Sequence, residues 1–194
     1  EAASIDLTIL CTITPDQTVP ASSAQIHEEL GLGGGAFDLN AACAGFVYGL
    51  VTAHGLLGTA ANRVLLVGAE TLSRITDWND RDTAVLFGDG GGALVLEFTP
   101  DEGQLLAWDL GVDGSARRLL WAEIGGTIEM DGRGVFKHAV RALVDSATRT
   151  LESAKVSADE VKLIVPHQAN IRIIQAACDR LGIGKFHHNR VHRS

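Results

Sequence analysis

The chain has 194 residues, of which 46% are hydrophobic, with 22 glycines and only 4 prolines. This composition excludes a disordered chain and suits a compact fold with a large buried core. The formal net charge of −8 disfavours a general nucleic-acid-binding role, and the apolar runs are shorter than the roughly 20 residues that span a bilayer. No basic segment precedes an apolar stretch at the start, so we expect a cytoplasmic protein without membrane contact.

Strand-like and helix-like segments alternate along the chain. In chain order we expect a strand at 5–13, a helix at 22–30 that ends at Gly31, a strand at 35–39, a helix at 40–58, strands at 63–68, 83–87, 92–98 and 105–110, a helix at 136–156, a strand at 161–165 and a helix at 170–181. Such alternation predicts an α/β layered fold with a mostly parallel central sheet.

Two segments of the chain share one pattern. Residues 5–33 and residues 161–184 each run through an apolar strand, a polar turn and an amphipathic helix, and they end in EELGLG and DRLGIG. This pattern indicates an internally duplicated domain, although similar strand-helix units also produce it by chance.

The three cysteines are widely spaced and odd in number, which argues against a disulfide framework. Cys11 and Cys178 lie in apolar or helical patterns, and we expect both to be small buried side chains. Cys43 differs, because it follows an apolar strand and opens a small-residue helix within NAACAGF. Backbone N–H groups and the positive end of a helix dipole favour a thiolate there and can hold an oxyanion, so we predict a nucleophile.

A second chemical signal is VPHQANIRII, which spans residues 165–174. His167 is expected at the carboxyl end of an apolar strand, where α/β sheets place ligands. A lone histidine is more often structural or solvated, but Gln168 and Asn170 follow it without an obvious core role. A cysteine and a distant histidine, each at a strand end, are typical of thiol acyl transfer.

Two other motifs are weaker signals. The glycine cluster FGDGGGA is not a phosphate loop, because no Gly-Lys-Ser/Thr follows it, and we expect it to pack tightly beside the active site. The histidine-rich HHNRVH near the end fits no regular zinc spacing. No metal site is therefore predicted.

Four motifs together resemble β-ketoacyl-acyl-carrier-protein synthase III, the initiating condensing enzyme of type II fatty-acid synthesis. They are NAACAGF, RDTAVLFGDGGGALVL, MDGRGVFKHAV and VPHQANIRII, in that order. The resemblance covers nearly the whole chain and implies the thiolase-like duplicated αβαβα layered fold, incomplete in this chain. It assigns residues 1–110 to the remainder of an N-terminal half with Cys43 and residues 111–194 to the start of a C-terminal half with His167.

The resemblance also implies a mechanism. Cys43 takes the acyl group of an acyl-CoA, and malonyl-acyl-carrier protein then loses CO2 and attacks the acyl-cysteine to give 3-oxoacyl-acyl-carrier protein. His167 stabilises the enolate by a hydrogen bond. A third catalytic residue, an asparagine, is expected beyond Ser194. The reaction needs no metal or organic cofactor, and a homodimer is expected.

Further residues match the family's binding regions. Phe136 and Asn170 are candidates for the substrate channel, although Phe136 could equally be a core residue. The stretch that matches the carrier-protein-binding region, together with a lysine that extends its basic patch, consists of Gln168, Ala169, Asn170, Ile171, Arg172 and Lys137. Arg172 is the expected contact for an acidic carrier protein, and the alternative is a solvated arginine at a helix start.

Two other functions stay open at this point. One is an acyltransferase of the same family that passes the acyl group from Cys43 to a hydroxyl or an amine in secondary metabolism. The other is a non-catalytic partner in a dimer, and the presence of both Cys43 and His167 counts against it.

Overall fold

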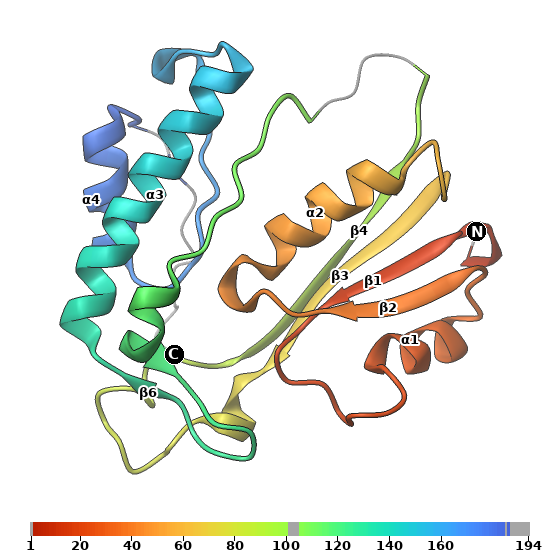
Figure 1. The fold of residues 1–194 in the computed structure, drawn as a ribbon, viewed down its shortest axis with the longest axis horizontal. Helices are drawn as coiled ribbons and strands as arrows, with labels where there is room; N and C mark the ends of the chain where they lie inside the picture. Colours follow the sequence, from red (N-terminus) through yellow and green to blue (C-terminus); the bar gives the residue numbers. More distant parts are fainter. Residues whose placement is uncertain (1, 101–104, 185, 187–194) are drawn as a thin grey trace, which may run out of the picture. The chain divides into compact units, whose positions relative to one another are not determined.

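The computed structural model describes residues 2–100, 105–184 and 186. It divides into two compact units (Figure 1). The first unit consists of Glu1–Arg74 and Phe87–Leu105, and the second of Ile75–Leu86 and Leu106–Ser194. The loop at 75–86 thus belongs to the second unit although it interrupts the sequence of the first. The division into halves at residue 110 stays a prediction.

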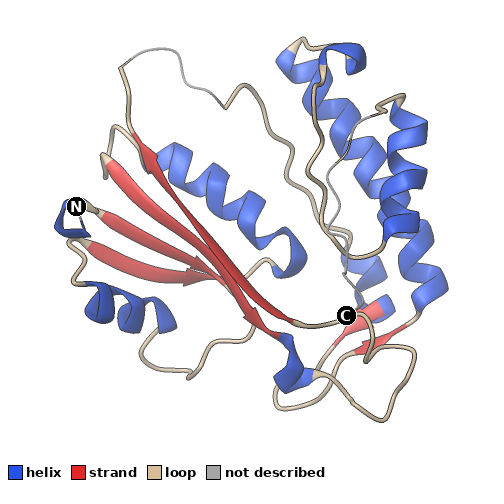
Figure 2. Ribbon diagram, turned by 180° about the vertical axis from the view of Figure 1, so that it is seen from behind, coloured by secondary structure: helices blue, strands red, loops and turns tan. Residues whose placement is uncertain are grey.

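The first unit is built on a four-stranded sheet with the order β2-β1-β3-β4 (Figure 2). Its strands are β1 (Leu7–Cys11), β2 (Gly35–Leu39), β3 (Arg63–Thr71) and β4 (Asp89–Glu97). β1 pairs in parallel with β2 and β3, and β4 runs antiparallel to β3. Cys11 at the end of β1 lies opposite both Leu39 and Gly68. The carboxyl ends of three parallel strands therefore meet at one edge of the sheet, where α/β folds place functional groups.

Helix α2 (Gly45–Leu56) covers one face of this sheet, over β1 and β3 (Figure 1). Ile9, Leu66 and Ala53 are fully buried between the helix and the strands. Complete burial of an isoleucine or leucine side chain contributes roughly 1.5–3 kcal/mol to stability. The contact of α2 with the two central strands is therefore the main core of the unit.

Helix α1 (Ser22–Leu30) packs on β1 and β2 at the other face, seen in Figure 1 on the opposite side of the sheet from α2. Ala21, at the N-cap position, provides no side-chain cap. Instead Asp38 of β2 accepts hydrogen bonds from the backbone N–H groups of Ser22 and Ser23, both at 2.9 Å. A residue from a neighbouring strand thus accepts hydrogen bonds from the backbone N–H groups that have no partner within the first turn of this helix.

The second unit is mainly helical. Its elements are η4 (Gly114–Leu119), β5 (Leu120–Trp121), β6 (Glu129–Met130), α3 (Gly132–Ala154), η5 (Ala158–Glu160) and α4 (Ile171–Leu181). α3 packs against α4, and α4 buries a stripe formed by Ile173, Ile174, Ala177 and Cys178. The stripe has the spacing of one helix face. No helix within the described ranges combines the length and apolar character that a membrane span needs.

Most expected elements of the first unit are confirmed. Helix 22–30 and strand 35–39 have the predicted bounds, and the strands expected at 5–13, 63–68 and 92–98 are present as β1, β3 and β4 with shifted ends. Cys11 and Cys178 are buried as expected. In the second unit, the helices expected at 136–156 and 170–181 are present as α3 and α4.

The helix expected at 40–58 is present as α2 with shifted ends, preceded by a 3-10 turn, η2 (Ala42–Ala44). Three expected strands are wrong. Residues 83–87 form turns, because Asp80 binds the Thr83 hydroxyl and the Ala84 N–H locally. Residues 105–110 and 161–165 form no strand. Among the described residues, segment 161–165 makes a single bridge, from Ile164 to Phe186, and a segment with so little pairing gains little from its β propensity.

Candidate active site

Cys43 lies in the turn that follows β2, at the edge where the parallel strands end. The side-chain oxygen of Asn40 accepts a hydrogen bond from the N–H of Ala42 at 3.3 Å. Ala42 has a φ of 45°, a left-handed conformation that costs a non-glycine residue on the order of 1–3 kcal/mol. Cys43 comes next and is exposed. A strained turn therefore presents this thiol at the surface of the unit.

The helix behind the turn is held by a close approach to the sheet. A Cβ placed at Gly49 would lie 2.5 Å from Cys11 Sγ and 2.7 Å from Leu66 Cδ1. Such distances do not occur in folded proteins, so only glycine lets α2 come this near to β1 and β3. The fixed position of α2 fixes the turn in front of it.

The pKa of the Cys43 thiol is raised above its usual value. Desolvation by the surrounding protein is the largest cause, the N–H of Cys43 itself lowers the pKa, and the charge of Glu70 raises it further. The backbone N–H at the helix start thus acts in the expected direction, but desolvation outweighs it in the free thiol. At neutral pH Cys43 is a protonated, exposed thiol.

Sequence reasoning missed the polar cluster beside this turn. Glu70 near the end of β3 accepts hydrogen bonds from the N–H of Ile13 at 2.9 Å and from the hydroxyls of Thr12 and Thr14 at 3.3 and 2.6 Å. The sequence does contain a signal for this cluster: in VLLVGAET an apolar strand ends in an acidic residue. Threonines at the end of the neighbouring strand supplied the matching donors.

His167 lies in the second unit, in an irregular segment between the bridge at Ile164 and helix α4. The side-chain amide of Gln168 donates to the carbonyl of Pro166 at 2.9 Å. Desolvation lowers the pKa of His167, so its imidazole is neutral at neutral pH. A neutral ring has one N–H donor and one acceptor nitrogen.

The remaining candidate residues also lie in the second unit. Asn170 caps α4, because its side-chain oxygen accepts the N–H of Arg172 at 2.8 Å. Phe136 and Lys137 lie near the start of α3, and both are exposed. Four neighbours of His167 are exposed as well, namely Gln168, Ala169, Ile171 and Arg172. All the candidates except Cys43 therefore belong to one unit.

The glycine cluster is not tightly packed in the first unit. A Cβ at Gly88, Gly90 or Gly92 would meet nothing within 4 Å, and one at Gly91 would make only ordinary contacts. The expectation of tight packing is therefore wrong within the described part of this unit. The reason is that these glycines lie on or beside the exposed first part of the edge strand β4.

Histidine-rich residues 187–192 lie outside the described part of the chain. Among the residues that are described, no three His, Cys, Asp or Glu side chains lie close enough to hold a metal ion.

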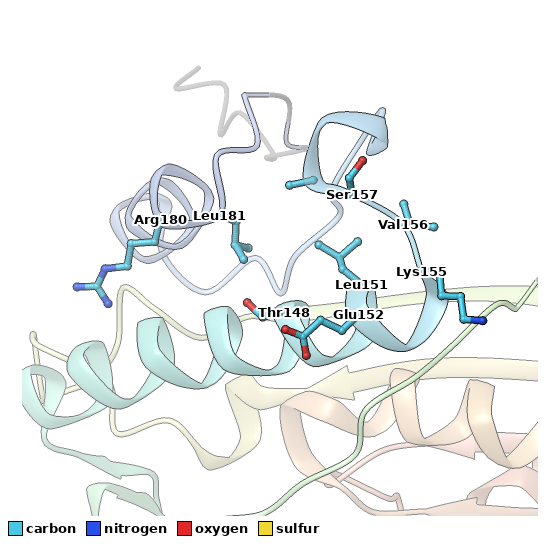
Figure 3. Close-up of a pocket in the computed structure, with 9 residues that line it drawn as sticks. Thr148, Leu151, Glu152, Lys155, Val156, Ser157, Arg180 and Leu181 are labelled. Atoms are coloured by element: carbon cyan, nitrogen blue, oxygen red, sulfur yellow. The ribbon is translucent and has the colours of Figure 1, made fainter.

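The second unit also has an open cavity of about 480 Å³ at the C-terminal ends of α3 and α4 (Figure 3). Residues that line it include Thr148, Leu151, Glu152, Lys155, Arg180 and Leu181. Arg180 and Leu181 end α4, whereas Asn170 precedes its first turn. A helix of this length separates its ends by roughly 15 Å. The cavity therefore lies away from His167 and its neighbours.

Comparison with known proteins gives one consistent result. Residues 37–114 match the family described as 3-oxoacyl-[acyl-carrier-protein] synthase III, and residues 151–189 match the C-terminal region of the same family. The chain is 48% identical to β-ketoacyl-[acyl-carrier-protein] synthase III of Geobacillus kaustophilus over 93% of its own length and 58% of the relative. For the enzyme of Paracoccus denitrificans the identity is 48%, over 93% of the chain and 60% of the relative.

A solved structure agrees with these relatives. The crystal structure of 3-oxoacyl-[acyl-carrier-protein] synthase III from Aquifex aeolicus has a TM-score of 0.94 and 42% identity to the chain, covering 97% of it and 62% of that structure. The chain thus spans about three fifths of the length of the relatives that it matches.

Proposed function

Because the chain belongs to the 3-oxoacyl-[acyl-carrier-protein] synthase III family and has its thiolase-like α/β fold, we propose that the whole protein starts fatty-acid synthesis in the cytoplasm. In this proposal it condenses an acyl-CoA primer with malonyl-acyl-carrier protein and releases CO2, CoA and 3-oxoacyl-acyl-carrier protein. The observation that carries the proposal is the exposed Cys43 on a strained turn at the carboxyl edge of the parallel strands.

Cys43 performs the first half of the proposed reaction. Its sulfur attacks the carbonyl carbon of the acyl-CoA thioester, and the C–S bond to CoA breaks. The thiol proton passes to the CoA sulfur, directly or through solvent, so that CoA leaves as a neutral thiol. The N–H of Cys43, which lowers the pKa of its own thiol, is the proposed donor for the oxyanion of the tetrahedral intermediate.

His167 takes part in the second half. The malonyl group loses CO2, and the electron pair of the broken C–C bond forms an enolate on the thioester. A neutral imidazole N–H donates a hydrogen bond to the enolate oxygen, a role that the lowered pKa of His167 supports. The carbanion then attacks the acyl carbon, the C–S bond to Cys43 breaks, and the sulfur leaves as a thiolate that takes up a proton from solvent. No step requires a metal or an organic cofactor.

The basic residues of the second unit are the proposed contacts for the carrier protein. Arg172 and Lys137 are exposed cations at the starts of α4 and α3, and they can attract an acidic partner although the whole chain is negatively charged. Asn170 and Phe136 are the proposed lining of the substrate channel. Because the side-chain oxygen of Asn170 is used as a helix cap, only its amide N–H groups are free to meet a substrate.

The proposed assembly is a homodimer. β4 is one of the two edge strands of the four-stranded sheet, and its residues are mostly exposed, including Val95 at 56%. An exposed edge strand of nine residues favours pairing with another chain.

The test uses two variants of the protein and mass spectrometry. Cys43→Ala should abolish the mass increase produced by acyl-CoA, because no acyl-enzyme forms. His167→Ala should keep acylation and lose decarboxylation of malonyl-acyl-carrier protein. Equal loss of both steps in His167→Ala would contradict the division of roles. Acylation of Cys43 followed by transfer to a hydroxyl or an amine, without loss of CO2, would favour the alternative acyltransferase.

A further inference from the structure

Three segments of the first unit meet at the edge that carries Cys43. Thr12–Thr14 follows β1, Asn40–Cys43 follows β2, and Glu70 lies near the end of β3. The backbone N–H of Thr12 donates to the carbonyl of Leu39 at 3.1 Å. The segment after β1 is therefore bonded directly to the residue from which the Cys43 turn departs.

The carboxylate of Glu70 anchors this segment. Its Oε1 accepts the N–H of Ile13 and its Oε2 accepts the hydroxyls of Thr12 and Thr14. The Thr14 hydroxyl in turn accepts the N–H of Thr71 at 2.8 Å. Three donors therefore converge on the Glu70 side chain. A carboxylate suits this position, because its two oxygens can accept all three hydrogen bonds and it carries no donor of its own.

Glu70 is also the charged side chain that affects the pKa of the Cys43 thiol. Its charge raises the pKa of the Cys43 thiol and that of the buried Cys11 thiol. Arg74 bonds the next part of the same loop, through Asp16 at 3.2 Å. The other titratable groups on these strands and on α2 are Asp38 on β2, which caps α1, Asp89 on β4, which binds Ser73, Tyr48 and His54 on α2, and Arg63 and Glu97, which pair with each other at the opposite end of β3.

We propose that Glu70 is a positioning residue for the Cys43 nucleophile: it fixes the Thr12–Thr14 segment against the Cys43 turn and holds its carboxylate charge at the sheet edge that carries the thiol. The inference rests on the proposed role of Cys43. The charge disfavours a second negative charge at Cys43 in the free protein. Since the thiolate is the nucleophilic form that reacts with oxidants and alkylating agents, Glu70 limits side reactions of an exposed thiol before substrate binds.

The experiment measures alkylation of Cys43 by iodoacetamide as a function of pH, with the modified peptide resolved from those of Cys11 and Cys178 by mass spectrometry. Glu70→Gln removes the charge and keeps the size of the side chain. Its alkylation midpoint should move to lower pH, and alkylation at neutral pH should be about two- to tenfold faster than in the unchanged protein. Glu70→Asp keeps the charge and should restore the midpoint.

The matched control is Glu97→Gln in the same sheet. Glu97 binds Arg63 at the opposite end of β3, at 2.8 Å. Glu97→Gln therefore removes a carboxylate from the same sheet and should leave the pH dependence of Cys43 alkylation unchanged. A purely structural role would lower thermal stability in Glu70→Gln and leave the midpoint unchanged, and that result would overturn the proposal.

A second variant covers the case in which Glu70→Gln does not fold. Thr14→Val removes one hydroxyl partner and keeps the carboxylate, so stability should fall while the midpoint stays or rises. A midpoint that falls in Thr14→Val would overturn the proposal. Alkylation reports the acidity of the thiol alone, whereas labelling with acyl-CoA reports acyl transfer, so the failure of this proposal is distinguishable from failure of the proposed function.

Discussion

Residues 5–33 form the strand β1 and the helix α1, whereas residues 161–184, with the same order of apolar, polar and amphipathic segments, form helix α4 after an irregular segment. The ends of the two helices agree closely. Gly31 and Gly182 both follow the last helical residue in the left-handed conformation, with φ of 59° and 68°. The two N-terminal parts differ, because β1 has a strand on each side, whereas segment 161–165 has one bridge to the part of the chain that the structure describes.

The difference separates local from non-local information. A glycine after a helix closes it through the adjacent turn, so the signal works wherever it occurs. A strand is stabilised by its neighbours, so the same apolar run forms a strand only where partners are available. In the second segment Leu163 and Val165 are 55% and 70% exposed, as expected for an apolar run that pairs with no strand of residues 2–100 and 105–184.

The largest expected effect concerns the packing that supports β1. Gly49→Ala places a methyl group against Cys11 and Leu66, and overpacking of this kind destabilises by about 1–3 kcal/mol. The protection of β1 amides against hydrogen exchange should fall with the free energy of unfolding.

Gly55→Ala is the control in the same helix. A Cβ at Gly55 meets nothing within 4 Å, so the higher helix propensity of alanine should stabilise by about 0.5–1 kcal/mol. If both variants were equally stable, the close approach of α2 would not support the strand.

The two helix starts should respond differently to loss of their caps. Asp38→Ala removes a carboxylate of β2 that accepts two N–H groups of α1, and the loss should cost about 1–3 kcal/mol. Asn170→Ala removes a local cap of α4 and should cost about 1 kcal/mol. Hydrogen exchange should show loosening of α1 together with β2 in the first variant and of the first turn of α4 alone in the second. The reverse pattern would contradict the distinction between a tertiary and a local cap.

The two helix ends, by contrast, should respond alike. Gly31→Ala and Gly182→Ala each force a Cβ into a left-handed conformation without any steric contact nearby, at a cost of roughly 1 kcal/mol each. Chemical denaturation of both variants provides the check. A clear difference between the two would show that the cap of one segment depends on its surroundings.

The sequence was sufficient where the determinants are local. The bounds of α1, the glycine ends and the position of Cys43 directly after β2 follow from residues that are close in the chain. The strained Ala42, the cap from Asp38 and the anchor at Glu70 depend on contacts between distant residues, and no pattern within one segment specifies them. For the same reason, the roles of Cys43 and His167 were suggested by motif and family resemblance and stay proposals.

Residues 105–110 were expected to be a strand, and within the second unit Asp109 is bonded to α3 through Arg149 and Ser146. Arg149 donates to both oxygens of Asp109, from Nε at 2.9 Å and from a terminal nitrogen at 2.8 Å. Hydrogen bonding by Arg149 is the largest cause that lowers the pKa of Asp109 to about 2. Because the folded state favours the ionised carboxylate, the stabilisation is complete above the ordinary pKa of about 4 and is lost as the pH falls toward 2.

The smallest expected effect follows from this pair. Arg149→Met should lower the thermal stability slightly above about pH 5, and the difference from the unchanged protein should disappear near pH 2, as measured by thermal unfolding across this range. The effect is small because the Arg149 side chain is 57% exposed and solvent screens the pair. Arg141→Met is the control on the same helix, since Arg141 is 81% exposed and only one of its nitrogens approaches Asp145, at 3.5 Å. The difference in thermal stability between Arg141→Met and the unchanged protein should be smaller than that for Arg149→Met and nearly independent of pH. An equal pH dependence in both variants would mean that segment 105–110 is not tied to α3 by this pair.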